Sequence, residues 1–278
     1  KYHPTGTFYQ AYPHPKTGKQ VMKYPIGLAL LYAPFFFLGH VYALISDYPP
    51  DGFSLPYQAA ISWGSMFIAF LGLWFCQKAL KQYFSTIISG SVVLLIAIAT
   101  NYLNYTSIDG AMAHNWGFTL FAILLYFSIK WYEQPSYGKS IIIGLCIGFA
   151  ILVRPTNILG ALIPLFWGIK DYAGMQERII LFKTYWKQLL SALISVIIIG
   201  SIQLVYWKYI TDNWIFYTYN EQGFSWFKPH VKNVLISYRK GWLIYTPIML
   251  LALIGFRLLY KNYRSLFLFC LGFFLLNF

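Results

Sequence analysis

Residues 57–76 read YQAAISWGSMFIAFLGLWFC and contain no charged side chain. A membrane-spanning helix needs about 20 predominantly apolar residues, because the hydrocarbon core of a bilayer is about 30 Å thick. Residues 188–207 and 242–260 form two more apolar runs of similar length. The sequence therefore predicts an all-α, polytopic membrane protein whose function lies in its few polar residues.

The composition agrees with this class, since 58% of the residues are apolar and only 10% are charged. In a soluble domain, the net charge of +13 would suggest a nucleic-acid partner. Here the basic residues lie in short loops between apolar runs, where they act as topology signals and contact anionic lipid headgroups. No nucleic-acid motif is present, so we expect membrane lipids as partners and no nucleic acid.

Apolar runs divide the whole chain. Segment 25–45 is interrupted by Pro34, and further apolar runs follow at about 57–76, 86–100, 112–129, 140–153, 157–169, 188–207, 242–260 and 265–278. We therefore expect a helical bundle of about eight spans, forming one transmembrane domain over residues 1–278. The chain begins with Lys1 in a polar stretch and ends inside an apolar run, so we expect a fragment of a longer protein.

Lysines and arginines in the short loops predict the orientation. Loops 46–56 and 101–113 contain neither residue, so we place them outside, together with the long aromatic loop 208–241. A loop of that length is usually functional. The basic residues gather in four stretches, which we expect to be cytoplasmic: 78–81, 130–139, 170–187 and 257–264.

Hydropathy leaves two regions open. Segment 25–45 is either a span, with 1–23 in the cytoplasm, or an interfacial helix, with 1–23 outside. Segments 140–153 and 157–169 are each short for a full span. A shallow hairpin around Arg154-Pro155 would accommodate both.

Arg154 is the first candidate site residue. It follows the apolar stretch Ile151–Val153, at the outer end of an apolar helix. A buried cation near a membrane is costly and usually serves a site. The alternative is an interfacial arginine whose charged head reaches water while its stem lies along apolar surface.

Asp109 and His114 are weaker catalytic candidates in the outer loop 101–113 and just after it. A carboxylate and an imidazole at the mouth of a helix could manage a proton. Their five-residue spacing is not that of a recognised metal-ligand pair, so we predict no metal site. Alternatively, Asp109 caps the helix that starts near Gly110.

Two further cations, Arg239 and Lys240, lie in segment 208–241 and are expected on the outer side. Lys23 precedes Pro25 at the start of segment 25–45, and by itself this indicates only a helix that begins at an interface. Arginine offers a bidentate fork and lysine a point charge, so such residues could bind a phosphate. The alternative is a solvated loop face without a ligand.

Three stretches taken together resemble the GT-C superfamily of polytopic glycosyltransferases, and most closely the bacterial relatives of protein O-mannosyltransferases and of lipid A aminoarabinose transferase. The stretches are KYPIGLALL at 23–31, GFAILVRPTN at 148–157 and RKGWLIYTP at 239–247. A histidine at the position of His114, just after a short outer loop, also resembles this group. The likeness extends over most of the chain, although each motif is short.

The resemblance implies transfer of a sugar from a polyprenyl-phosphate donor to a lipid, glycan or protein acceptor on the extracytoplasmic face. It implies that Lys23 faces the donor phosphate. By their charge, Arg154, Arg239 and Lys240 are the further candidates for binding that phosphate. It also implies that residues 1–56 belong to the first outer loop and that 25–45 is an interfacial helix. The family's catalytic carboxylate is expected upstream of Lys1, so the catalytic residue is unknown, and the use of a divalent metal stays open.

Two other functions remain open at this stage. A secondary transporter or lipid flippase would also be polytopic, but it would place ionisable residues near the bilayer midplane and show an internal repeat. A non-catalytic membrane assembly subunit would need no converging cations. For the transferase, we expect a multi-pass protein of the bacterial inner membrane.

Overall fold

The computed structural model describes residues 10–218, 230–239 and 241–276, and about 75% of these residues are helical. This confirms the all-α class. The elements in chain order are β1 (Ala11–Pro13), β2 (Gln20–Met22), α1 (Gly27–Leu44), α2 (Leu55–Leu80), α3 (Thr86–Ala99), η1 (Asn104–Ile108), α4 (Ala113–Glu133), α5 (Tyr137–Val153), η2 (Pro155–Ala161), α6 (Leu162–Phe166), α7 (Tyr172–Thr184), α8 (Trp186–Thr211), α9 (Val231–Ile236), α10 (Trp242–Tyr245), α11 (Met249–Asn262) and α12 (Arg264–Leu276).

Among the described residues, three helices are long and apolar enough to cross a membrane: α1, α2 and α8. This is fewer than the roughly eight spans predicted from the apolar runs. Several of those runs form shorter helices, such as α3 with 14 residues and α5 with 17. A 14-residue helix is about 21 Å long, which is less than the thickness of the hydrocarbon core.

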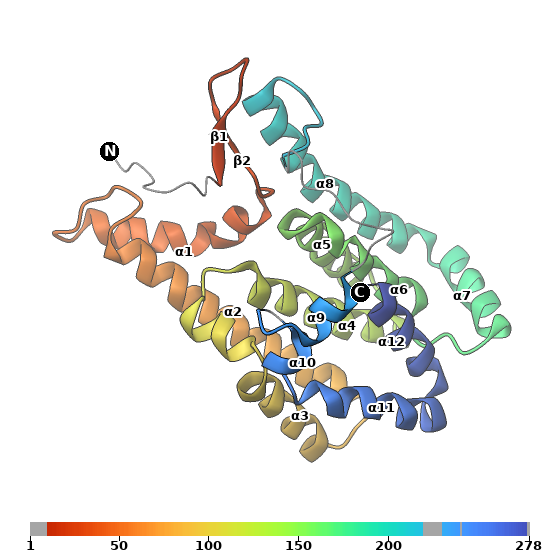
Figure 1. The fold of residues 1–278 in the computed structure, drawn as a ribbon. Coiled ribbons are helices and arrows are strands. Elements are labelled where there is room, and N and C mark those ends of the chain that lie inside the picture. The colour runs from red at the N-terminus through yellow and green to blue at the C-terminus, as the bar shows by residue number, and fades with distance from the viewer. Residues whose placement is uncertain (1–9, 219–229, 240, 277–278) are drawn as a thin grey trace.

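Five helices pack side by side in the order α1, α2, α4, α5, α8 (Figure 1). Helices α2 and α4 run parallel, because Ser65 contacts Trp116 and, further along both helices, Gly72 packs on Thr119. Helices α5 and α8 are also parallel, because Gly144 packs on Ala192 and, further along both helices, Gly148 packs on Ile199. Parallel neighbours require a return segment, and α3 and η2–α6 supply the two returns.

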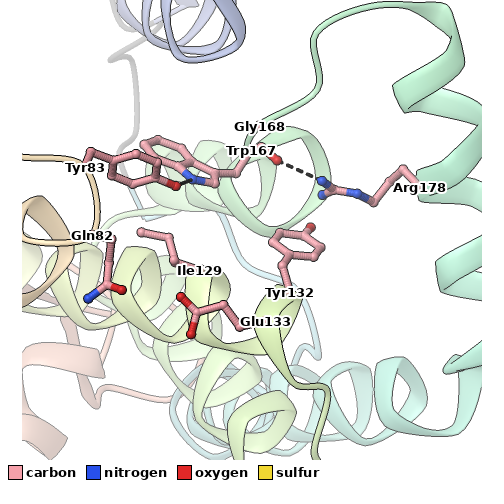
Figure 2. Close-up of a pocket in the computed structure, with 8 residues that line it drawn as sticks. All are labelled: Gln82, Tyr83, Ile129, Tyr132, Glu133, Trp167, Gly168 and Arg178. Atoms are coloured by element: carbon pink, nitrogen blue, oxygen red, sulfur yellow. Dashed lines mark hydrogen bonds between the residues drawn. The ribbon is translucent and has the colours of Figure 1, made fainter. Parts of the chain in front are cut away.

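The bundle has two distinct ends. At one, which we call the hairpin end, the antiparallel strands β1 and β2 dock on the last turn of α8, where Thr17 Oγ1 donates to the Ile210 carbonyl at 2.6 Å. At the other, which we call the lysine end, Trp167 Nε1 donates to Tyr83 Oη at 2.8 Å (Figure 2). Lys130 lies at the lysine end and pairs with Glu133 at 2.8 Å.

Helix α1 contacts the other helices near the hairpin end. A Cβ atom at Gly27 would overlap the backbone of Leu152, in the last turn of α5. A Cβ atom at Gly39 would come within 3.0 Å of Tyr57, in the first turn of α2. The beginning and the end of α1 therefore both pack on turns from the same end of the bundle.

The predicted apolar run 242–260 is not one helix. It divides into α10 and α11, and Thr246 between them has φ −135° and ψ 64°. The residue before a proline is pushed out of the α region, and proline itself lacks the N–H that a continuing helix would use. Pro247 therefore explains the break, and the expectation of a continuous segment here was wrong.

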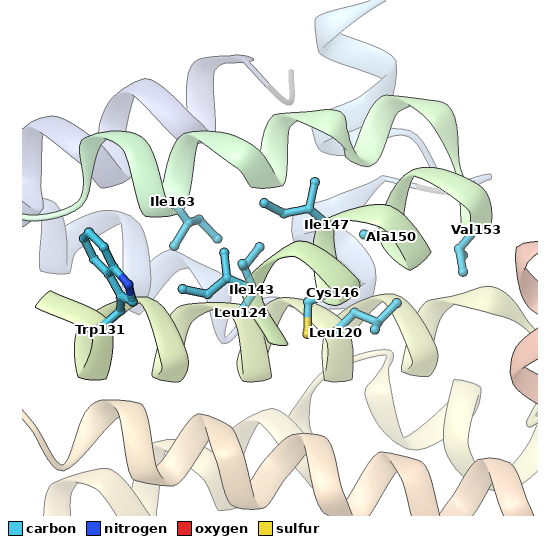
Figure 3. Packing of buried hydrophobic residues seen from close by; sticks show 9 residues of the cluster. All are labelled: Leu120, Leu124, Trp131, Ile143, Cys146, Ile147, Ala150, Val153 and Ile163. Atoms are coloured by element: carbon cyan, nitrogen blue, oxygen red, sulfur yellow. The ribbon is translucent and has the colours of Figure 1, made fainter. Parts of the chain in front are cut away.

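The main apolar core lies between α4, α5 and α6 (Figure 3). Close packing lets many small dispersion contacts add up, so this core fixes the position of the end of α5. Its buried members are Leu120, Leu124, Trp131, Ile143, Cys146, Ile147, Ala150, Val153 and Ile163.

Candidate functional site

Arg154 ends helix α5 at the hairpin end. Its backbone is extended, with φ −151° and ψ 127°, and Pro155 begins the following 3-10 turn. This confirms the predicted break at Arg154-Pro155. Two residues before it, Leu152 is buried, whereas Arg154 is exposed. The core therefore holds the backbone of Arg154 while its guanidinium reaches outward.

The structure brings Arg154 and His114 together. Arg154 Nη2 lies 3.5 Å from His114 Nε2, although the two residues are 40 positions apart. Arginine has only donors, so the facing nitrogen of His114 acts as the acceptor in this pair. The imidazole also stacks on the Tyr105 ring, with 4.1 Å between ring centroids and an interplanar angle of 27°.

Asp109 does not cap the following helix, although one interpretation of the sequence predicts that it does. Helix α4 begins at Ala113, and its N-cap residue, Met112, makes no side-chain cap. Asp109 instead ends the π-helical turn η1, where its Oδ2 accepts from Asn104 Nδ2 at 3.0 Å. The capping interpretation was therefore wrong. Asp109 and His114 are both attached to η1, through its consecutive residues Asn104 and Tyr105.

Lys23 lies between β2 and α1, also at the hairpin end. Its carbonyl accepts from Thr218 Oγ1 at 2.6 Å, and its backbone N–H donates to the Gln10 carbonyl at 2.8 Å. Four residues later, Gly27 packs on Leu152. The chain around Lys23 is thus tied to the same end of α5 that carries Arg154.

A mostly apolar cavity of ≈ 370 Å³ is lined in part by residues that are close to these cations in the chain. Leu152 and Pro155, which flank Val153 and Arg154 in the chain, both line this cavity. Pro25, two residues after Lys23, lines it as well. Apolar walls favour a hydrocarbon chain over water. The rest of the lining comes from the end of α8 and the residues after it: Gly200, Gln203, Leu204, Trp207, Phe216, Tyr217 and Thr218.

Other predicted site residues are not joined to this group. Arg239 is exposed after α9, and within the described residues no hydrogen bond or ion pair links its side chain to Arg154 or Lys23. Lys240 lies outside the described residues. No group of three or more His, Cys, Asp or Glu side chains in the described part of the chain could hold a metal ion.

Gln203 also belongs to the site, although it was not predicted from the sequence. Its Oε1 accepts from the Ile26 N–H at 2.8 Å, which satisfies a free donor at the start of α1. Gln203 is buried and lies within the apolar run 188–207. A polar side chain inside such a run was the available signal, because an unpaired amide there is costly.

No protein-family model matches this chain, and comparison with curated proteins and with solved structures gives no match. The site is therefore interpreted from its own geometry.

Proposed function

We propose that this protein transfers a sugar from a polyprenyl-phosphate donor to a lipid, glycan or protein acceptor on the extracytoplasmic face of a membrane. The observation that carries the proposal is the Arg154–His114 pair, because Leu152 and Pro155, close to Arg154 in the chain, line an apolar cavity. A polyprenyl phosphate has the same two parts, an anionic head and a hydrocarbon tail.

The charges suit the departure of a phosphate. In the transfer, an acceptor hydroxyl attacks the anomeric carbon, and the bond from that carbon to the phosphate oxygen breaks with its electron pair on the phosphate. Arg154 and Lys23 would stabilise the negative charge as it develops. The hydroxyl proton goes to a base, for which Asp109 and His114 are the candidates within the described residues.

The directions of the segments support a multi-pass arrangement of about eight crossings. The return segment α3 lies between α2 and α4, and the return segment η2–α6 lies between α5 and α8. The turn between α11 and α12 lies at the lysine end, where Tyr263 contacts Phe84 at 5.8 Å between ring centroids. Phe273, further along α12, contacts Phe121 in α4. Short helices embedded among longer ones tolerate mismatch at modest cost.

The contacts of α1 support the interfacial placement that the GT-C resemblance implies. Gly27 and Gly39 pack on turns from the same end of the bundle, so α1 would lie across that end. A basic lysine end favours the cytoplasm and leaves the hairpin end outside. The bacterial inner membrane is the location that we propose for this arrangement.

The test is a transfer assay with the full-length protein in detergent, radiolabelled polyprenyl-phosphate sugars and a membrane extract as the source of acceptor. We expect Arg154→Ala to lower the rate by about 100-fold, as the loss of a group that stabilises transition-state charge does, and Lys23→Ala to lower it as well. Lys81→Ala, an exposed cation at the lysine end, is the control and should keep wild-type turnover.

Wild-type turnover by Arg154→Ala would remove this residue from the site. A lipid flippase is the second candidate, because the Arg154 guanidinium, whose chain neighbours line an apolar cavity, also suits the carriage of a lipid phosphate. If the well-folded protein consumes no donor but moves it across vesicle membranes, that function replaces the transferase.

A further inference from the structure

A second pocket, of ≈ 340 Å³, lies at the lysine end, remote from Arg154 (Figure 2). Trp167 and Tyr83 form one wall, with Gln82, Ile129 and Glu133 opposite. Arg178 and Tyr132 close one side. None of these residues takes part in the proposed sugar transfer.

Neutral groups hold the Arg178 guanidinium in place. Its Nη2 donates to the Trp167 carbonyl at 2.8 Å, and its Cζ lies 3.7 Å from the centroid of the Tyr132 ring. The Tyr132 hydroxyl in turn donates to the Pro164 carbonyl. These contacts fix the direction of the fork but do not neutralise its charge.

No carboxylate neutralises Arg178 either, as far as the described residues show. Glu133 lines the same pocket, but its two oxygens accept from Lys130 Nζ at 3.1 and 2.8 Å. Lys130 also donates to Gln82 at 2.8 Å. Arg178 is half-buried, and burial lowers its pKa from the ordinary value. A bound anion would offset this desolvation cost.

We propose that this pocket binds the phosphodiester of a membrane phospholipid. Arg178 has N–H donors beyond those that reach the carbonyls of Trp167 and Leu165. A guanidinium fork matches phosphate oxygens. Trp167 and Tyr83 are amphipathic aromatic residues of the kind that lie at headgroup level. The neighbouring lysines, including Lys81 and Lys170, would attract anionic lipid to this end.

The test is native mass spectrometry of the full chain in detergent, titrated with phosphatidylglycerol. We expect Arg178→Gln to weaken binding by about tenfold or more, because charge-assisted hydrogen bonds are lost. Lys183→Gln is the matched control, since Lys183 is an exposed cation on the same helix, α7. It should change binding by about twofold or less, because solvent screens an exposed charge.

A second pair of variants tests the proposal independently, in case Arg178→Gln does not fold. Gln82 is exposed and lines the pocket, so Gln82→Trp would fill it while leaving Arg178 in place, and Gln82→Ala would leave it open. We expect only Gln82→Trp to lose the lipid.

Three results would overturn the proposal. One is wild-type binding by Arg178→Gln or by Gln82→Trp. Another is an equal loss in Lys183→Gln, which would indicate a general effect of surface charge. The third is displacement of the lipid by an equal concentration of glycerol 3-phosphate, which would assign the pocket to a soluble phosphate.

Discussion

Gly144 fixes the distance between α5 and α8, the helices whose ends hold Arg154 and the hairpin. A Cβ atom there would overlap the carbonyl oxygen of Ala192. Because that oxygen belongs to the backbone of α8, it cannot move aside as a flexible side chain would. We therefore expect Gly144→Ala to lower the free energy of unfolding by about 1–3 kcal/mol, the usual cost of overpacking. Thermal unfolding in detergent measures it.

Gly117→Ala is the matched control for that variant. It introduces the same methyl group inside α4, at a position where a Cβ atom meets nothing within 4 Å. Alanine favours a helix over glycine by about 1 kcal/mol, so this variant should be as stable as the wild type or slightly more stable. Equal melting temperatures for the two variants would show that α5 and α8 are not held at this distance.

The position of a single residue could be predicted from the sequence where its immediate neighbours in the chain determine it. Arg154 follows an apolar run and precedes a proline, so its position at a helix end could be inferred. Its contact with His114 could not, because 40 residues separate them and the packing of α4 on α5 sets the distance. The same holds for Gln203, whose partner is the backbone of a distant segment.

For helix α1, length and packing indicate different placements in the membrane. Its 18 apolar residues suffice for a span, yet its contacts lie across the hairpin end of the bundle. If α1 is interfacial, Gln20→Cys and Asp47→Cys, which flank it at exposed positions, should both react with a membrane-impermeant maleimide from outside. A transmembrane α1 would give reaction at only one of the two positions.

The apolar runs predicted that helices form in these segments better than they predicted whether each helix is continuous. Residues 188–207 became α8, because no proline or glycine pair interrupts them. Residues 242–260 divided at Pro247, which the composition of the run already contained as a signal. The β1–β2 hairpin was missed, since strands of three residues are too short for a period of two to be recognised.

The two ends of the molecule carry different groups, and this polarity from end to end follows neither from hydropathy nor from any single helix. Lysines gather where α2 and α4 end, and the candidate site lies where α5 and α8 end. Parallel pairs of helices with short return segments place these groups at opposite ends. The lysines and arginines predict the side of each loop but not the pairing of the helices, which depends on small residues such as Gly72 and Gly144 at close contacts.

This polarity predicts opposite accessibility for two exposed positions. Ile108 in η1 belongs to the hairpin end and Lys183 in α7 to the lysine end. With Cys76, Cys146 and Cys270 replaced by alanine, we expect Ile108→Cys to react with an impermeant maleimide in intact cells. Lys183→Cys should react only after the membrane is opened, because positive loops stay in the cytoplasm. The reverse pattern would place Arg154 and its cavity on the cytoplasmic face and exclude transfer to an extracytoplasmic acceptor, whereas reaction of both positions in intact cells would contradict a membrane-spanning bundle between them.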